Sequence, residues 1–173
     1  MTRTPIWIFS ILLLLQACSN PSIVNVDSKA TQVISPSSTV YVARFEGSPD
    51  YVDAATDFFI AELESRIGNT VIAGSAVRQE STDVRSGGNI APVTLALEDA
   101  KANGADILVM GKVAGDKTAG TLNGFSTVHV YEVASGNRLA NFHRPSGKLM
   151  GYSVHQVIMA AVKRTAKDVA AIF

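Results

Sequence analysis

The feature that most limits how this chain can fold lies near its amino terminus, where an apolar run ends close to the only cysteine. Residues 6–15 are almost entirely apolar, and Cys18 follows them. A run of about ten apolar residues has the length of a signal-peptide core, whereas a helix needs about 20 to span a bilayer. Because the sequence contains no second cysteine, no intramolecular disulfide can form, and stability must come from an ordinary hydrophobic core.

The stretch Leu15-Gln16-Ala17-Cys18 resembles the lipobox of bacterial lipoproteins. The resemblance implies that residues 1–17 are a signal peptide, that the chain is cut before Cys18, and that this cysteine is acylated and anchors the protein to a membrane. It also implies the outer membrane, with the domain facing the periplasm, because Ser19 stands where an aspartate would favour the inner membrane. The alternatives are an ordinary secretory signal with an incidental cysteine and an uncut membrane anchor.

Residues 18–38 are predicted to follow as a lipidated cysteine and a flexible tether, because they are polar and rich in serine and proline. About twenty flexible residues have a typical end-to-end distance of roughly 25 Å, so the domain should stay close to its membrane. The short runs 23–26 and 32–34 could instead add a strand to the domain.

Residues 39–173 are predicted to form one periplasmic α/β domain. Apolar residues make up 47% of the sequence and charged residues 17%, so a sizeable core can form. The clearest elements are a helix over 52–67, where apolar residues recur every three or four positions, and a central strand at 107–110, apolar on both faces. A short Gly/Asn turn at 134–137 indicates a β-hairpin.

The predicted element order is β-α-β-α-β-β-β-α, which indicates a single mixed sheet with helices packed on it. Strands are expected over 39–45, 70–73, 107–113, 125–133 and 138–143, and helices over 52–67, between Pro92 and Gly104, and over 154–172.

Two polar, Gly-containing stretches, 74–89 and 114–124, are predicted to be long loops. Loops of that length in a compact domain are more often functional or disordered than merely connective. We therefore expect partner contacts there, with Arg78, Arg85 and Lys117 as the charged members.

Residues 105–113 (ADILVMGKV) and 128–139 (VHVYEVASGNRL) resemble a pattern shared by periplasmic α/β domains similar to the TolB amino-terminal domain, LpoB and CsgG. The resemblance covers most of the mature chain and lies in strands and turns. It implies an envelope lipoprotein that binds other proteins or assembles into larger machines, with no shared catalytic residue. The long tether of the LpoB type is missing here, and 74–89 is too polar for a membrane-crossing hairpin of the CsgG type.

No motif predicts a catalytic site, a cofactor or a metal. Residues 111–118 approach a phosphate-binding loop, but Asp116 intrudes before the lysine and a strand follows instead of a helix. His129, His143 and His155 are spread over two strands and a helix, without the spacing typical of metal ligands.

Charge argues against a polyanionic partner. Removing residues 1–17 takes away Arg3, so 15 basic and 15 acidic residues become 14 and 15. Nucleic-acid binding normally requires a basic excess, so no nucleic-acid partner is expected. A small basic stripe on the last helix is interpreted as solvated, or less often as a contact surface: Lys163, Arg164 and Lys167.

The sequence supports a class of function. The leading hypothesis is a non-enzymatic envelope lipoprotein that binds a protein partner as a regulator or assembly component. The first alternative is a homo-oligomeric subunit of a secretion or flagella-associated ring, and the second is a lipoprotein that binds a small ligand or acts as a hydrolase.

Overall fold

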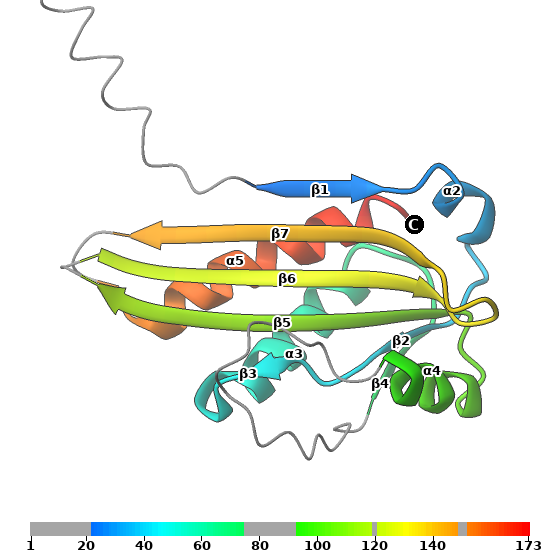
Figure 1. Ribbon diagram of the computed structural model, residues 1–173, viewed down its shortest axis with the longest axis horizontal. Coiled ribbons are helices and arrows are strands. Elements are labelled where there is room, and N and C mark those ends of the chain that lie inside the picture. The colour runs from blue at the N-terminus through cyan, green and yellow to red at the C-terminus, as the bar shows by residue number, and fades with distance from the viewer. Residues whose placement is uncertain (1–21, 75–92, 119–120, 149–151) are drawn as a thin grey trace, which may run out of the picture.

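A computed structural model describes residues 22–74, 93–118, 121–148 and 152–173 (Figure 1). Over these ranges the chain forms one seven-stranded mixed sheet with four helices, so the predicted α/β fold is confirmed. The strands are β1 (Ile23–Val26), β2 (Val40–Val42), β3 (Glu46–Gly47), β4 (Val71–Ala73), β5 (Ile107–Thr118), β6 (Thr121–Glu132) and β7 (Arg138–Lys148), and the helices are α2 (Ala30–Val33), α3 (Pro49–Glu64), α4 (Val93–Ala102) and α5 (Val154–Ala170).

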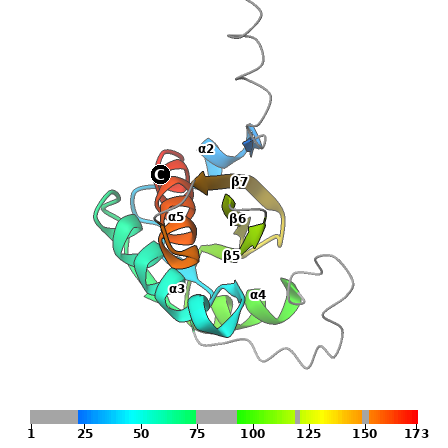
Figure 2. The same cartoon turned by 90° about the vertical axis from the view of Figure 1, so that its left-hand side faces the viewer.

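The sheet combines a parallel half and an antiparallel half. Its order is β1-β7-β6-β5-β2-β4, and the short β3 pairs with β5. β2 runs parallel to both β4 and β5, because the connections through α3 and α4 return the chain to the same edge. β5, β6, β7 and β1 are antiparallel neighbours. Figures 1 and 2 show α3 and α5 together on one face of the sheet and α4 on the other.

Most of the hydrophobic core lies between the sheet and the layer formed by α3 and α5. Phe59 and Leu63 on α3 and Ile158 and Val162 on α5 are fully buried, as the periodicity of both helices predicts. The ring of Phe59 lies 5.0 Å from that of Phe45, measured between centroids. This layer therefore holds the two halves of the sheet together.

A smaller core lies under α4, on the opposite face of the sheet. Ala96 and Ala100 are fully buried against Tyr41 and Leu108. The Tyr41 hydroxyl also donates a hydrogen bond to the Asp99 carboxylate. Small residues on α4 thus let the helix approach the sheet closely over β2 and the first half of β5.

The predicted loop over 114–124 is wrong, because these residues belong to the two strands of a long hairpin. Ala114 pairs with Phe125 and Lys117 pairs with Leu122, so the ladder between β5 and β6 continues to Thr118 and Thr121. The glycines that suggested a loop serve close packing: a Cβ atom at Gly124 would lie 3.1 Å from the Ile158 backbone nitrogen. By contrast, the predicted turn at 134–137 is confirmed, and Gly136 adopts a φ of 69° there.

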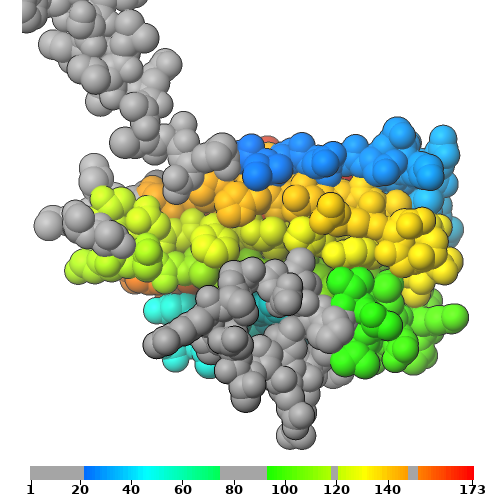
Figure 3. All heavy atoms as spheres, viewed as in Figure 1, coloured from blue at the N-terminus to red at the C-terminus, as the bar shows by residue number. Residues whose placement is uncertain are grey.

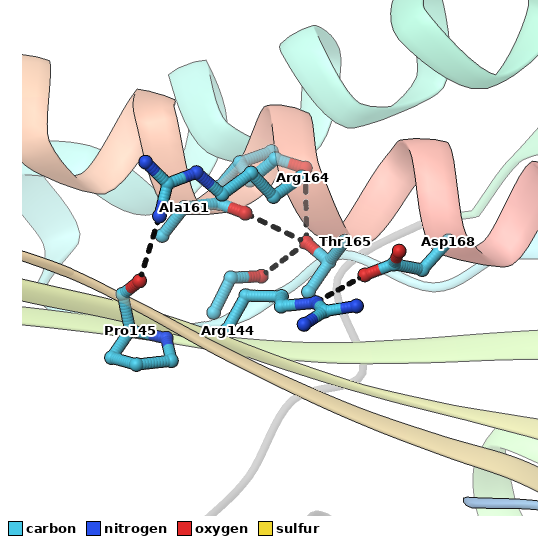
Figure 4. A network of polar contacts seen from close by, with 8 residues as sticks. Arg144, Pro145, Ala161, Arg164, Thr165 and Asp168 are labelled. Carbon is cyan, nitrogen blue, oxygen red and sulfur yellow. Dashed lines mark hydrogen bonds and ion pairs between the residues drawn. The ribbon is translucent and has the colours of Figure 1, made fainter. Parts of the chain in front are cut away.

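Helix α5 is fastened to the sheet by polar contacts as well as by the core (Figure 4). Arg144 Nε on β7 donates to Asp168 Oδ2 at 2.5 Å, and Arg164 Nη1 donates to the Pro145 carbonyl at 3.2 Å. Between them, the fully buried hydroxyls of Ser126 and Thr165 share a hydrogen bond of 2.8 Å. The helix begins with a capping box formed by Ser153 and Gln156. Its position over β6 and β7 is therefore closely specified.

Part of the predicted tether belongs to the folded domain. Residues 23–26 form β1, which pairs antiparallel with β7, so the strand considered for this run is present. Ala30 and Ile34 are buried in the main core, and Asn69 Nδ2 donates to the carbonyls of Ser35 and Ser38 at 2.8 and 2.9 Å. The chain is thus held against the sheet from Ile23 onward.

Candidate functional site

The face of the long hairpin that is turned away from α3 and α5 is the candidate functional site. We call it the hairpin face and define it by the residues of β5, β6 and β7 that point away from α3 and α5. Among the described helices, only α4 packs on this side, at the end near β2 (Figure 3). By strand register the hairpin face consists of Met110, Lys112, Ala114 and Asp116 on β5, Asn123, Phe125, Thr127 and His129 on β6, and Asn141, His143 and Pro145 on β7.

The centre of this face is a polar pair joined across two strands. Thr127 lies opposite His143, and Thr127 Oγ1 is 2.8 Å from His143 Nδ1. The ring of Phe125 lies beside that of His143, with centroids 5.6 Å apart. A hydroxyl beside a histidine can also act as a nucleophile with its base, but such pairs use a third group to orient the histidine. In the described part of the chain, the side chains found beside His143 are Thr127 and Phe125, and neither is a carboxylate.

One residue pair further along the same strands, His129 lies opposite Asn141. His129 Nδ1 and Asn141 Oδ1 are buried, and neither has a hydrogen-bond partner among the described residues. Burial lowers the pKa of His129, and the positive charge of Arg138 lowers it further, so the neutral imidazole is favoured. Two buried polar atoms without partners in the described part of the chain are costly for the fold.

Two hollows lie at opposite ends of the sheet. One, of about 320 Å³, is at the β5–β6 hairpin end and is lined by Ala114, Gly115, Asp116, Asn123 and Phe125. The other, of about 430 Å³, is lined mainly by the loop after α2, the end of α4 and the end of β6. In the second hollow Asp106 Oδ2 already accepts a hydrogen bond from the Thr39 backbone nitrogen at 2.8 Å, and Glu132 accepts one from Ser135. Its carboxylates are therefore engaged in holding the fold.

The structure brings together two of the three histidines. His129 and His143 both belong to the hairpin face, whereas His155 lies on α5 with its ring 6.2 Å from that of Tyr51. Within the described ranges, no group of three or more His, Cys, Asp or Glu side chains could hold a metal ion. The turn at 134–137 predicts that the strands of the two histidines are neighbours, but the register also depends on a shift between Val130 and Tyr131 that the turn does not reveal.

Of the other four predicted site residues, the structure describes only one. Cys18, Arg78 and Arg85 lie outside the described residues. Lys117 is described, and it is exposed near the end of β5. Residues 111–118, whose sequence partly resembles a phosphate-binding loop, lie within β5. They form an extended strand and not the loop that would wrap a phosphate.

Several charged helix residues have partners on neighbouring parts of the domain. Glu62 on α3 pairs with Arg66 at 2.7 Å and with Lys163 on α5 at 3.4 Å, and the pKa of Glu62 is lowered first by the hydrogen bond from Arg66. Asp53 pairs with Arg44 at 2.5 Å. Together with the Arg164 contact to β7, these pairs show that much of the acidic and basic helix surface has partners within the domain.

Sequence comparison gives no relatives: no protein-family model matches the chain, and no curated protein matches it. Several solved structures share its fold. PelC from Paraburkholderia phytofirmans, solved as a dodecamer, matches with a TM-score of 0.61 and 14% identity over 88% of this chain and 97% of that chain. The hypothetical protein CT253 from Chlamydia trachomatis matches with a TM-score of 0.53 and 9% identity over 79% of this chain and 97% of that chain.

A third match is the LpoB C-terminal domain from Salmonella enterica, with a TM-score of 0.42 and 16% identity over 68% of this chain and 90% of that chain. All three identities are low, so the PelC and CT253 matches show likeness of fold alone. They confirm the α/β architecture that the sequence pattern predicts. As a separate observation, none of the described helices is both long enough and apolar enough to cross a membrane.

Proposed function

We propose that this protein is a lipid-anchored, non-enzymatic component of the bacterial outer membrane that works in the periplasm by assembling with copies of itself. The observation that carries the proposal is the fold likeness to PelC, which was solved as a dodecamer and matches over nearly its whole chain. An assembly also gives the hairpin face a role, because a neighbouring copy could cover its part-exposed side chains, among them Phe125, Thr127 and His143.

The assembly surface is testable by a matched pair of charge reversals in the soluble domain that starts at Ser19. Lys112→Glu changes the hairpin face, and Lys167→Glu changes an exposed lysine on α5, on the other side of the sheet. Sedimentation velocity of the parent domain should show a species larger than a monomer, and Lys112→Glu should shift it toward the monomer while Lys167→Glu does not. Loss of assembly in Lys167→Glu alone would move the interface to the basic stripe of α5.

A second candidate function is the binding of a different envelope protein through the same face, as a regulator. The mixture of Phe125, Pro145 and paired polar groups favours it, because protein-binding patches combine apolar area with groups that fix orientation. Co-purification from envelope membranes separates the candidates. A stable monomer that captures a different protein supports regulation, whereas recovery of tagged and untagged copies together supports self-assembly.

Anchoring rests on Cys18 and is tested independently of assembly. Cys18→Ser should abolish incorporation of labelled palmitate and leave an uncut precursor or a protein released from membranes. Ser19→Asp should shift the acylated protein toward the inner membrane in a fractionation experiment. Unchanged membrane extraction of Cys18→Ser would refute acylation at this residue, and a parent protein already found in the inner membrane would refute the predicted sorting.

A further inference from the structure

The direction of β1 determines which end of the sheet lies nearest to the amino terminus. β1 runs antiparallel to β7, with Ile23 opposite His143 and Val26 opposite Ala140. Followed backward from Ile23, the chain therefore leaves the sheet on the side where β7 ends. Figure 1 shows that β5 ends, β6 begins and α5 begins on this same side, which we call the hairpin end.

The chain between Cys18 and the first residue of β1 is short. Five residue steps separate Cys18 from Ile23, and fully extended chain spans at most about 3.3–3.6 Å per residue, so the two Cα atoms lie within roughly 17 Å of each other. Five residues of β7 also separate His143 from Lys148, which at about 3.4 Å per residue is again roughly 17 Å. An acylated Cys18 can therefore reach no further than the level of the hairpin end.

The described side chains at the hairpin end suit the headgroup layer of a bilayer. Tyr152, just before α5, is 52% exposed, and Lys117 and Asp116 on β5 are also exposed. Tyrosine places an apolar ring and a polar hydroxyl at the boundary between membrane and water, and lysine extends its amine toward headgroups. The charged neighbours keep this end out of the hydrocarbon core.

Near the hairpin end, the start of α5 packs closely on the strands. A Cβ atom at Gly115 would lie 2.8 Å from Val154 Cγ1 and 3.0 Å from the Asn123 carbonyl oxygen, so the start of α5 packs directly on the hairpin. The capping box of Ser153 and Gln156 fixes the chain immediately after Tyr152. Tyr152 and Lys117 therefore lie next to the segments that these contacts hold together.

We infer that the hairpin end, with Tyr152 and Lys117, rests on the lipid headgroups of the membrane that holds Cys18. The inference rests on the proposed acylation of Cys18, and it replaces the freely hanging domain expected from a twenty-residue tether. Strands of twelve residues are roughly 40 Å long, so the hollow of about 430 Å³ at the opposite end lies far from the membrane.

Single-tryptophan fluorescence tests this orientation, because the only native tryptophan, Trp7, is removed with the signal peptide. Tyr152→Trp labels the hairpin end. Leu95→Trp is the matched control, since Leu95 is 48% exposed and belongs to α4, which Figure 1 shows toward the opposite end. Each acylated full-length protein is placed in vesicles of phosphatidylethanolamine and phosphatidylglycerol with brominated acyl chains. We expect Tyr152→Trp to lose fluorescence and shift to the blue relative to vesicles without bromine, and Leu95→Trp to do neither.

A third protein tests the role of the short tether. A Gly/Ser spacer of about twenty residues after Ser19 adds a typical reach of about 25 Å, so the quenching of Tyr152→Trp should be lost. Equal quenching with and without the spacer would overturn the tether argument, and an unquenched Tyr152→Trp protein that carries labelled palmitate would overturn the orientation while leaving anchoring intact. A protein that takes up no palmitate would overturn both this inference and the proposed anchoring.

Discussion

The two faces of the long hairpin are made from the same strands, but their side chains differ in size, polarity and burial. Toward α5, β6 presents Leu122, Gly124, Ser126, Val128 and Val130, all buried. On the hairpin face it presents larger or more polar residues that are partly exposed, among them Phe125, Thr127 and His129. The β6 residues that face α5 are small or compact because this helix lies within contact distance, whereas the β6 residues of the hairpin face point away from it.

The difference teaches where stability and function are to be sought. Side chains on the covered face contact many neighbours, so their loss costs unfolding free energy whatever the protein does. On the hairpin face the notable feature is a part-buried, hydrogen-bonded Thr127–His143 pair beside the ring of Phe125. Such groups add little to the core and are well suited to contacts with another molecule.

The largest expected effect comes from a truncation in the main core, between the sheet and the layer of α3 and α5. Phe59 is fully buried against Phe45, so Phe59→Ala should lower the free energy of unfolding by about 3–5 kcal/mol, measured by urea denaturation of the soluble domain. Phe125→Ala on the hairpin face is the matched control and should cost much less. Equal losses from the two substitutions would contradict the division between the faces.

Overpacking the covered face should have the next largest effect. In Gly124→Ala, the added Cβ would lie 3.1 Å from backbone atoms of Val157 and Ile158, so α5 must shift, at a cost of about 1–3 kcal/mol. Gly147→Ala in β7 is the control, because its Cβ would meet nothing closer than 3.6 Å. Thermal unfolding should separate the two variants, and a destabilised Gly147→Ala protein with an unaffected Gly124→Ala protein would show that close helix packing is not the reason for the glycine.

A smaller change in stability should accompany a larger change in assembly on the hairpin face. Thr127→Val removes the hydrogen bond to His143 and should cost only about 1 kcal/mol, since the site is part-buried and the shape is kept. If the face is the assembly surface, the same variant should weaken self-association in sedimentation velocity. Ser135→Ala, in the exposed turn at the far end of the hairpin, should leave association unchanged.

The smallest expected effect concerns pH. Because burial lowers the pKa of His129 in the folded protein, the unfolded chain binds a proton more readily below the ordinary histidine pKa of about 6.5. This contribution to stability is therefore fully present above about pH 6.5 and is lost as the pH falls. Between about pH 7.5 and 5.5 the melting temperature should fall less in His129→Gln than in the parent, and identical slopes would show that His129 is not desolvated.

Local patterns predicted most of the elements but not the extent of the hairpin. Each of the predicted features depends on residues that are only a few positions apart in the sequence. They are the apolar periods of α3 and of α5, the apolar run at the start of β5 and the turn at Gly136. Residues 114–124 were predicted as a loop because glycine and polar residues dominate them. The missed signal was the alternation of Leu122, Gly124 and Ser126 in phase with Val128, which indicates one continuous face.

The sequence predicted less of the candidate site than of the fold. Thr127, His129, Asn141 and His143 are ordinary strand residues in the sequence, and they come together only through the register between β6 and β7. The charged residues that the sequence favoured are not shown to share a site: Lys117 lies at the hairpin end, and Arg78 and Arg85 lie outside the described residues. Partner contact by these three residues stays a prediction.

The sequence by itself determined the α/β class, the order of the main elements and the position of the only cysteine, because each depends on residues close together in the chain. Only the tertiary structure decided that β1 pairs with β7, that one face of the hairpin packs on α5, and that two histidines share the opposite face. These features depend on contacts between residues far apart in sequence, and such contacts form only when the whole sheet is assembled around α5.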